Sequence, residues 1–231
     1  MNTNETTTQN QDVINMPRLG EPAPEFRAMT TMGKINFPSD FTGKWKILFS
    51  HPADFTPVCT TEFIAFAKMK AEFDALNTQL VGLSIDGLQS HIAWIRSIKE
   101  NVEWNGERGI DINFPIITDI SMKVAKLYGM IQPGMANTQT VRAVFFIDPE
   151  NVMRAMIYYP MSLGRNFDEI KRVIQALQVA DESHVSTPAN WRPGDNVVVG
   201  APQSAAEAAE RKEGKDSSLT CHEWYLCSKK L

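Results

Sequence analysis

Residues 46–62 read Lys46-Ile47-Leu48-Phe49-Ser50-His51-Pro52-Ala53-Asp54-Phe55-Thr56-Pro57-Val58-Cys59-Thr60-Thr61-Glu62. The first five residues are mostly apolar, and such a short run predicts a buried strand. Pro52 ends this run, and Pro57 stands where proline is favoured, in the first turn of a helix. The stretch therefore predicts a strand, a short loop and a helix, with Cys59 in the first helical turn.

The helix expected after Pro57 has one apolar face. Cys59, Phe63, Phe66, Met69 and Phe73 recur at steps of three and four residues, which is the repeat of a helix surface. Free N–H groups and the helix dipole favour negative charge at a helix start, so a cysteine there is biased toward the reactive thiolate. With Cys59 early and two cysteines near the C-terminus, the pattern indicates redox chemistry.

The rest of the chain alternates between strand and helix patterns. These are a hairpin over 26–36, strands over 79–85 and 114–117, a second hairpin from 141–147 and 152–159, and helices carrying Ile92, Ile95 and Ile98, then Val124, Ala125 and Leu127, then Phe167, Ile170, Ile174 and Leu177. Alternating units that end in a hairpin predict an α/β fold, a mixed sheet with helices on both faces.

The chain is expected to have three parts. Residues 1–16 form a polar leader that we expect to be disordered, residues 17–180 form the main domain, and residues 181–231 form an extended C-terminal arm with one helix near 203–212. The arm has too few residues for a core of its own, so we expect it to pack on the main domain or on a partner subunit.

Composition excludes several classes of protein. The chain has 231 residues and a net charge of -4, which favours neither nucleic acid nor an anionic membrane surface as a partner. No apolar run approaches the roughly 18 residues of a membrane span. The N-terminus has neither the basic nor the apolar region of a secretory signal, so we expect a cytoplasmic protein.

The other two cysteines, Cys221 and Cys227, have polar neighbours. In a reducing compartment this favours metal ligands or working thiols over a disulfide scaffold. Together with His222 they offer three ligands and no second pair, so a structural zinc site is not expected. We expect no metal and no cofactor.

Several residues, some near Cys59 in the sequence and one far from it, are candidates to activate its thiol. Thr56, three residues upstream, can offer a hydroxyl to the sulfur or to a substrate, and Pro52 can shield the loop from water. The loop contains no Lys or Arg, so a permanent positive charge must come from elsewhere in the fold. Arg142 is the best candidate, because the apolar residues that follow it make a solvated position there unlikely.

The spacing Pro52-x-x-x-Thr56-x-x-Cys59 resembles the active-site motif of the peroxiredoxins, and its surroundings resemble the 1-Cys-type branch. The resemblance covers about residues 17–205, with supporting matches at Ser84-Ile85-Asp86 followed by His91 and Trp94, at 142–148 and at 163–170. It implies a thioredoxin-like fold and a thiol peroxidase.

The same resemblance implies roles for individual residues. Cys59 would be the peroxidatic cysteine, Arg142 the peroxide-binding arginine, and Glu62 the residue that orients Arg142. His51 and Arg165 would line the pocket. The substrates would be hydrogen peroxide and organic hydroperoxides.

The C-terminal segment resembles the two-cysteine tail of archaeal-type members of this branch. That resemblance implies a disulfide between Cys59 and Cys227, with Cys221 as a relay. In the family, this disulfide forms between neighbouring subunits. It also implies an external dithiol reductant such as a thioredoxin-like protein, and homodimers that assemble into a ring, a decamer. Whether the tail reaches Cys59 within or between chains is not readable from the sequence.

Plainer interpretations stand beside these. A lone cysteine on a helix is most often a buried apolar residue, Thr56 could serve only as an N-cap, and Glu62 could be a carboxylate favoured by the helix dipole. A general disulfide oxidoreductase needs a second cysteine close to Cys59, and residues 60–62 contain none. A redox sensor or an oxidation-triggered holdase stays open as an additional role.

Overall fold

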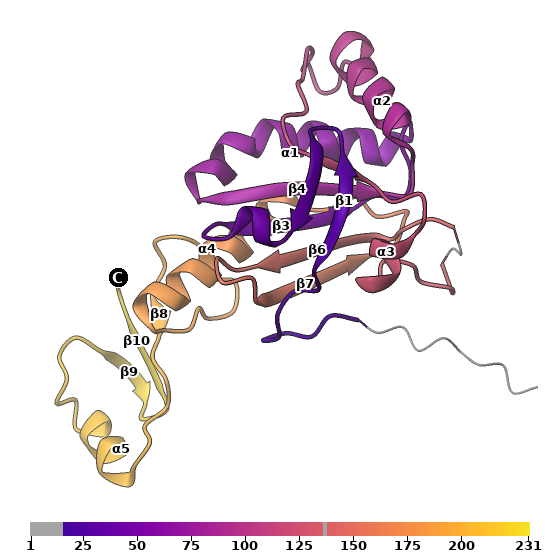
Figure 1. Cartoon of the computed structure of the whole chain (residues 1–231). Coiled ribbons are helices and arrows are strands. Elements are labelled where there is room, and N and C mark those ends of the chain that lie inside the picture. Colours follow the sequence, from indigo (N-terminus) through magenta and orange to yellow (C-terminus); the bar gives the residue numbers. More distant parts are fainter. Residues whose placement is uncertain (1–15, 136–137) are drawn as a thin grey trace, which may run out of the picture. The chain divides into compact units, whose positions relative to one another are not determined.

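The computed structural model describes residues 16–135 and 138–231 (Figure 1). The leader predicted for residues 1–16 lies outside the described residues, apart from Met16. The chain divides into two compact units, one that ends at Arg165 and one that covers Asn166–Leu231. The last helix expected in the main domain therefore groups with the C-terminal arm.

The first unit is built around a mixed sheet of seven strands in the order β2-β1-β5-β4-β3-β6-β7. β3, β4 and β5 run parallel, and the neighbours on either side are antiparallel. Its elements are β1 (Phe26–Thr30), β2 (Gly33–Phe37), β3 (Trp45–Ser50), α1 (Pro57–Ala75), β4 (Thr78–Ser84), α2 (Leu88–Asn101), β5 (Ile116–Thr118), α3 (Lys123–Leu127), β6 (Arg142–Ile147) and β7 (Met153–Tyr159). Both predicted hairpins and each predicted strand and helix of this unit are present.

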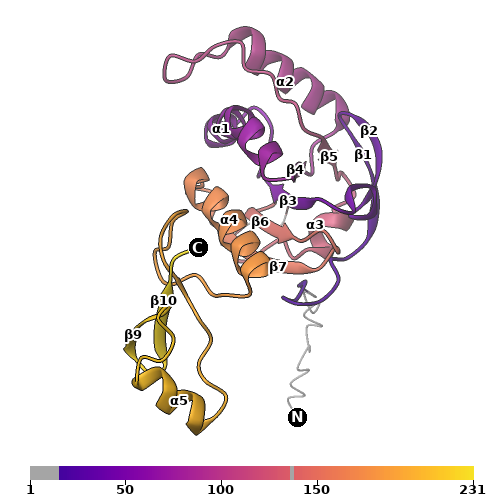
Figure 2. The ribbon, with the colours of Figure 1, turned by 90° about the vertical axis from the view of Figure 1, so that its left-hand side faces the viewer.

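Helices cover both faces of this sheet, as Figure 2 shows for α1 and α3. On β3, Phe49 stacks on Phe66 of α1, with ring centroids 4.0 Å apart. The preceding residue, Leu48, joins the cluster on the opposite face with Val124 and Ala125 of α3. Successive side chains of a strand point to opposite faces, so one central strand is buried by both layers.

The buried face of α2 includes one of the three isoleucines that mark this helix in the sequence. His91, Trp94 and Ile98 are its buried residues, whereas Ile92 is 47% exposed. His91 bonds to a buried carboxylate, and Trp94 packs on Phe63 of α1 with ring centroids 4.6 Å apart. Two aromatic rings with polar edges therefore share this face with Ile98.

The second unit contains α4 (Phe167–Ser183), β8 (Val197–Val198), α5 (Ala205–Lys212), β9 (Thr220–Glu223) and β10 (Leu226–Lys229). The buried residues of the arm, Trp191 and Val197, pack against Ala176 of α4, the helix that was expected to belong to the main domain. The three-stranded sheet β8-β10-β9 was not predicted, since its strands are only two to four residues long. None of the helices in the described residues is long and apolar enough to span a bilayer.

Candidate active site

Cys59 lies in the first turn of α1 and is completely buried. Proline occupies the start of this helix at position 57, and Thr56 is its N-cap. Since the sulfur is a free thiol in the structure, it is available for chemistry once a small substrate reaches it. The first-turn position predicted from the sequence is therefore confirmed.

The positive charge that the loop lacks comes from Arg142. Its Nη1 atom donates a hydrogen bond to Sγ of Cys59 over 3.3 Å. Its Nε and Nη2 atoms both donate to the carbonyl of Met161, at 2.9 and 2.7 Å. Two of its nitrogens are thus held by the Met161 carbonyl, and the third lies against the sulfur.

The sheet explains why Arg142 is here. β6 runs antiparallel to β3, with Phe49 opposite Val144, so the first residue of β6 lies beside the last residues of β3. Ser50 fixes this junction, since its hydroxyl donates to the carbonyl of Val141 over 2.6 Å. The chain leaving β3 leads into α1, and Arg142 therefore faces the start of that helix.

Glu62 holds the arginine in place. Its carboxylate accepts a 2.8 Å hydrogen bond from Nη1 of Arg142 and three more from the backbone nitrogen, Nε and Nη2 of Arg165, at 3.0, 3.0 and 2.6 Å. Burial alone would raise the pKa of Glu62, but the charges and hydrogen bonds of Arg165 and then Arg142 outweigh it, so the pKa lies below the ordinary value. Glu62 is therefore a carboxylate in the folded chain.

Arg165 is a buried support. Its Nη1 atom donates to the carbonyls of Ser50 and Ala143, at 3.0 and 3.3 Å, and its guanidinium lies over the rings of Phe49 and Phe66. The sequence suggested a pocket-lining residue; the structure gives Arg165 contacts to Glu62, backbone and rings. Cys59, Glu62, Arg142 and Arg165 thus form one continuous network.

Thr56 and Pro52 flank this network. The hydroxyl of Thr56 donates to the carbonyl of Ala53 over 2.9 Å, and it makes no capping hydrogen bond to the helix. Because its proton is committed to Ala53, its lone pairs are left to accept a hydrogen bond. Pro52 is buried in the same loop.

His51 belongs to a second buried network that the sequence did not reveal. Its Nε2 atom lies 2.9 Å from Oδ1 of Asp54, and Nδ1 of His91 lies 2.8 Å from Oδ2 of the same carboxylate. Because a carboxylate only accepts, both histidine nitrogens donate to it. Burial lowers the pKa of His51 and Asp54 opposes this only in part, so the ring is neutral and its Nδ1, which has no partner among the described residues, is a bare acceptor.

These three side chains also have the composition of a metal site, with donor atoms within 4.8 Å of one another. Each close contact among them is already a histidine–carboxylate hydrogen bond. The two histidines hold the pKa of Asp54 below its ordinary value even though burial acts in the opposite direction. Hydrogen bonding accounts for the whole cluster, and we assign no ion to it.

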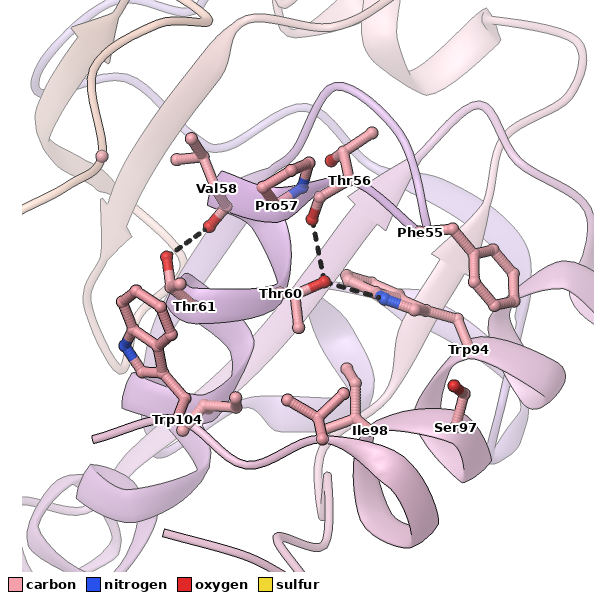
Figure 3. Close-up of a pocket in the computed structure, with 13 residues that line it drawn as sticks. Phe55, Thr56, Pro57, Val58, Thr60, Thr61, Trp94, Ser97, Ile98 and Trp104 are labelled. Carbon is pink, nitrogen blue, oxygen red and sulfur yellow. Dashed lines mark hydrogen bonds between the residues drawn. The ribbon is translucent and has the colours of Figure 1, made fainter. Parts of the chain in front are cut away.

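An apolar groove of about 700 Å³ runs along the outer side of the same helix start (Figure 3). Pro57, Val58, Ile98 and Trp104 are among its walls, and Trp94 donates to the hydroxyl of Thr60 over 3.2 Å at its floor. Cys59 does not line this groove, because its side chain points inward to Arg142. The groove is therefore a neighbour of the sulfur and not its direct surroundings.

The tail cysteines lie opposite each other on β9 and β10 and form a disulfide with an S–S distance of 2.07 Å. The expected Cys59–Cys227 bond is therefore not the one in this structure, where Cys227 is paired with Cys221 of its own chain. The physical reason is register, because the hairpin places the two α-carbons 4.0 Å apart. With both sulfurs in a disulfide, a zinc site with His222 is also ruled out in this state.

Sequence reasoning gave no role to Asp54 or to the carbonyl of Met161, and it named His91 only as a match to the family. His91 carried a signal, since a histidine on the buried side of an amphipathic helix needs a partner. The Met161 carbonyl carried none, because a backbone group has no sequence signature.

Comparison with known proteins agrees with this geometry. Residues 19–156 match the AhpC/TSA family, and residues 176–215 match the C-terminal domain of 1-Cys peroxiredoxin. A peroxiredoxin of Methanosarcina mazei is 53% identical over 215 residues, which are 93% of this chain and 98% of the relative. A peroxiredoxin of Aquifex aeolicus is 51% identical over 231 aligned positions, covering 95% of this chain and 100% of the relative.

Solved structures give the same result. A yeast mitochondrial 1-Cys peroxiredoxin, described in a study of its thiol resolving mechanism via glutathione/thioredoxin systems, has a TM-score of 0.78 and 40% identity, covering 94% of this chain and all of that one. A cysteine-to-serine mutant of peroxiredoxin 6 of Arenicola marina has a TM-score of 0.79 and 34% identity, covering 93% and 98%. The thioredoxin-like fold is confirmed, and the chain belongs to the AhpC/TSA family as a 1-Cys-type peroxiredoxin, a thiol peroxidase.

Proposed function

We propose that Cys59 is the peroxidatic cysteine and that this protein reduces hydrogen peroxide and organic hydroperoxides. The thiolate sulfur attacks the terminal peroxide oxygen, the O–O bond breaks, and the other oxygen leaves with a proton as water or an alcohol. Cys59 becomes a sulfenic acid. The observation that carries the proposal is the 3.3 Å contact from Nη1 of Arg142 to Sγ of Cys59.

The neighbours of Cys59 divide the work. Arg142 stabilises the thiolate and the charge that develops on the leaving oxygen, Glu62 and Arg165 hold Arg142 in place, and Thr56 accepts a hydrogen bond from the peroxide. Pro52 keeps water from the loop. His51 contributes a neutral ring at the same end of β3.

The sulfenic acid is then removed by the tail. The thiol of Cys227, in the proposal from the partner subunit, condenses with the oxidised Cys59 to a disulfide and releases water. Cys221 attacks Cys227, which frees the Cys59 thiolate and leaves the Cys221–Cys227 pair. An external dithiol such as a thioredoxin-like protein reduces that pair, which completes a cycle of antioxidant defence.

A buried sulfur has to become accessible for this exchange. We propose that the first turn of α1 unwinds after oxidation, because local segments open at far lower free energy than the whole fold. Hydrogen exchange at residues 56–62 should then increase in the peroxide-treated protein relative to the reduced one. Unchanged exchange there would contradict the unwinding.

The experiment that tests the peroxidase assignment uses three serine variants, with peroxide and dithiothreitol to measure turnover, and with peroxide alone to measure the crosslink and the stoichiometry. Cys59→Ser should lose turnover; retained turnover would overturn the proposal. Cys221→Ser should accumulate a dimer crosslinked through Cys59 and Cys227 on a non-reducing gel, because the relay is blocked. Cys227→Ser should give no such crosslink, while its Cys59 still consumes one equivalent of peroxide.

The quaternary structure follows from the same proposal. A tail that serves its neighbour requires at least a homodimer, and we propose that dimers assemble further into a ring of the decamer type. The native mass with and without peroxide measures this directly. A monomer in both states would contradict resolution between subunits. The cytoplasmic location of the protein stays a prediction.

A further inference from the structure

The two sulfurs of the tail disulfide differ sharply in their surroundings. Cys227 is completely buried, whereas Cys221 is half-buried. The sheet order β8-β10-β9 explains the difference, because Cys227 is on the central strand and Cys221 is on the edge strand. The backbone of Cys227 is also covered, since its carbonyl accepts a hydrogen bond from Val199 over 3.0 Å.

Cys221 also faces open space of its own. It lines a cavity of about 550 Å³ between α5 and β9, whose walls include the charged side chains of Glu207, Arg211, Lys215 and Asp216. Charges of both signs and one apolar wall, Leu219, make a surface that another protein or a polar thiol can approach. Cys227 is not among the residues that line this cavity.

We infer that the external dithiol attacks the sulfur of Cys221 and that Cys227 is the leaving thiol. In thiol–disulfide exchange the attacked sulfur is selected by access as well as by the leaving group. This inference rests on the proposed function, which supplies the tail disulfide as the species to be reduced, and adds which of its two sulfurs forms the mixed disulfide.

The step balances as follows. The thiolate of the reductant bonds to Sγ of Cys221, the Cys221–Cys227 bond breaks, and the electron pair leaves with Sγ of Cys227, which takes up a proton. The carbonyl of Glu223 lies 3.5 Å from that sulfur and can accept the new S–H group. The second thiol of the reductant then attacks the reductant's sulfur in the mixed disulfide. This releases Cys221 as a thiol and leaves the reductant as an internal disulfide. The tail gains two electrons and two protons.

A monothiol carries no second thiol of its own, so a brief reaction that is quenched early traps the first mixed disulfide, which gives a direct test. The full chain, oxidised in the tail, is mixed with 2-mercaptoethanol, quenched with acid and N-ethylmaleimide while most of the disulfide is still intact, and cleaved with chymotrypsin at Trp224 and Tyr225 between the cysteines. We expect mercaptoethanol on Cys221 and maleimide on Cys227, with this adduct roughly tenfold more abundant than its reverse. Equal or reversed labelling would overturn the inference.

Two tryptophan variants provide a matched comparison. Leu219→Trp narrows the cavity in front of Cys221, whereas Leu226→Trp adds the same bulk beside Cys227, at a position that is 45% exposed. Reduction of the tail disulfide by dithiothreitol, followed by maleimide labelling, should slow several-fold in Leu219→Trp and stay near wild type in Leu226→Trp. Slowing only in Leu226→Trp would contradict the inference.

Peroxide is absent from both measurements, so they do not depend on the peroxidase assignment. If Cys59→Ser retained turnover, the proposed function would fail while the labelling result stood. If turnover behaved as proposed but the adduct formed on Cys227, only the present inference would fail. The adduct map uses the wild-type chain, so it remains decisive even if a tryptophan variant folds poorly.

Discussion

Replacing Glu62 with glutamine tests the buried arginine network. The carboxylate is 2% exposed and accepts four hydrogen bonds, two on each oxygen, from Arg142 and Arg165. A glutamine keeps one oxygen and turns the other into an NH₂ group that faces two donors. It also leaves two guanidinium charges buried without their counter-charge, at 3% and 6% exposure.

Breaking a buried ion pair from one side costs about 3 to 5 kcal/mol of unfolding free energy, because the remaining charge is desolvated and unpaired. The matched control is Glu169→Gln. Glu169 also accepts two hydrogen bonds from one arginine, Arg172, at 2.6 and 2.8 Å, but its side chain is 39% exposed. An exposed pair of this kind contributes about 1 kcal/mol or less.

Urea denaturation of both variants and the wild type measures the difference. We expect Glu62→Gln to lose several times more stability than Glu169→Gln, and to lose peroxide turnover because Arg142 is no longer held against Cys59. Equal losses in the two variants, or a loss of under about 1 kcal/mol for Glu62→Gln, would refute the reasoning.

The pH dependence of the same variant has a definite sign. The pKa of Glu62 is below its ordinary 4.5 in the folded chain, so the unfolded chain binds the proton first on acidification. The stabilisation by Glu62 is complete above pH 4.5 and is lost as the pH falls through the lower folded value. The stability gap between wild type and Glu62→Gln should therefore narrow below pH 4.5 and stay constant above it.

Three further perturbations test other parts of the structure. Arg142→Lys keeps a charge but loses the clamp on the Met161 carbonyl, so the rate constant for peroxide should fall about 100-fold in stopped-flow measurements, and a change of under twofold would contradict its role. Gly82→Ala places a Cβ atom 3.3 Å from the ring of Phe49 and should cost about 1 to 3 kcal/mol in urea, whereas Gly134→Ala, with open space around it, should cost almost nothing. Burial lowers the pKa of Lys46 to about 8 from 10.5, against the pull of nearby carboxylates, so the unfolded chain keeps this proton longer as pH rises. Lys46→Met should be more stable than wild type by about 1 kcal/mol at pH 7, and the difference should shrink between pH 8 and 10.5; an increase over that range would contradict the sign.

The layers of the first unit could be predicted because each strand and helix has its own local pattern. The apolar run of β3 and the three-and-four repeat of α1 specify their elements without help from distant residues. Ile92 shows the limit, since the buried face of α2 is decided by Asp54 and Phe63, which approach it from other segments. A local pattern contains no information about partners that the fold supplies.

The candidate site divides in the same way. Cys59 and Glu62 are three positions apart on one helix, so their common orientation follows from the helical repeat. Arg142 is more than eighty residues later and reaches the sulfur only through the antiparallel register of β3 and β6, which no spacing in the sequence encodes. The Cys221–Cys227 pair depends on a hairpin whose strands are too short to be predicted.

The spacing of Cys59 and Glu62 on α1 makes two states of the site mutually exclusive. One nitrogen of Arg142 contacts the sulfur and the carboxylate together, so the nucleophile and the anchor of its activating charge share the same stretch of helix. If that stretch unwinds to offer the sulfur to a tail cysteine, it withdraws the sulfur from the guanidinium in the same movement. Under the proposed function, the chain holds Cys59 for reaction with peroxide or presents it to a thiol, and this shared contact keeps the two reactions from occurring at once.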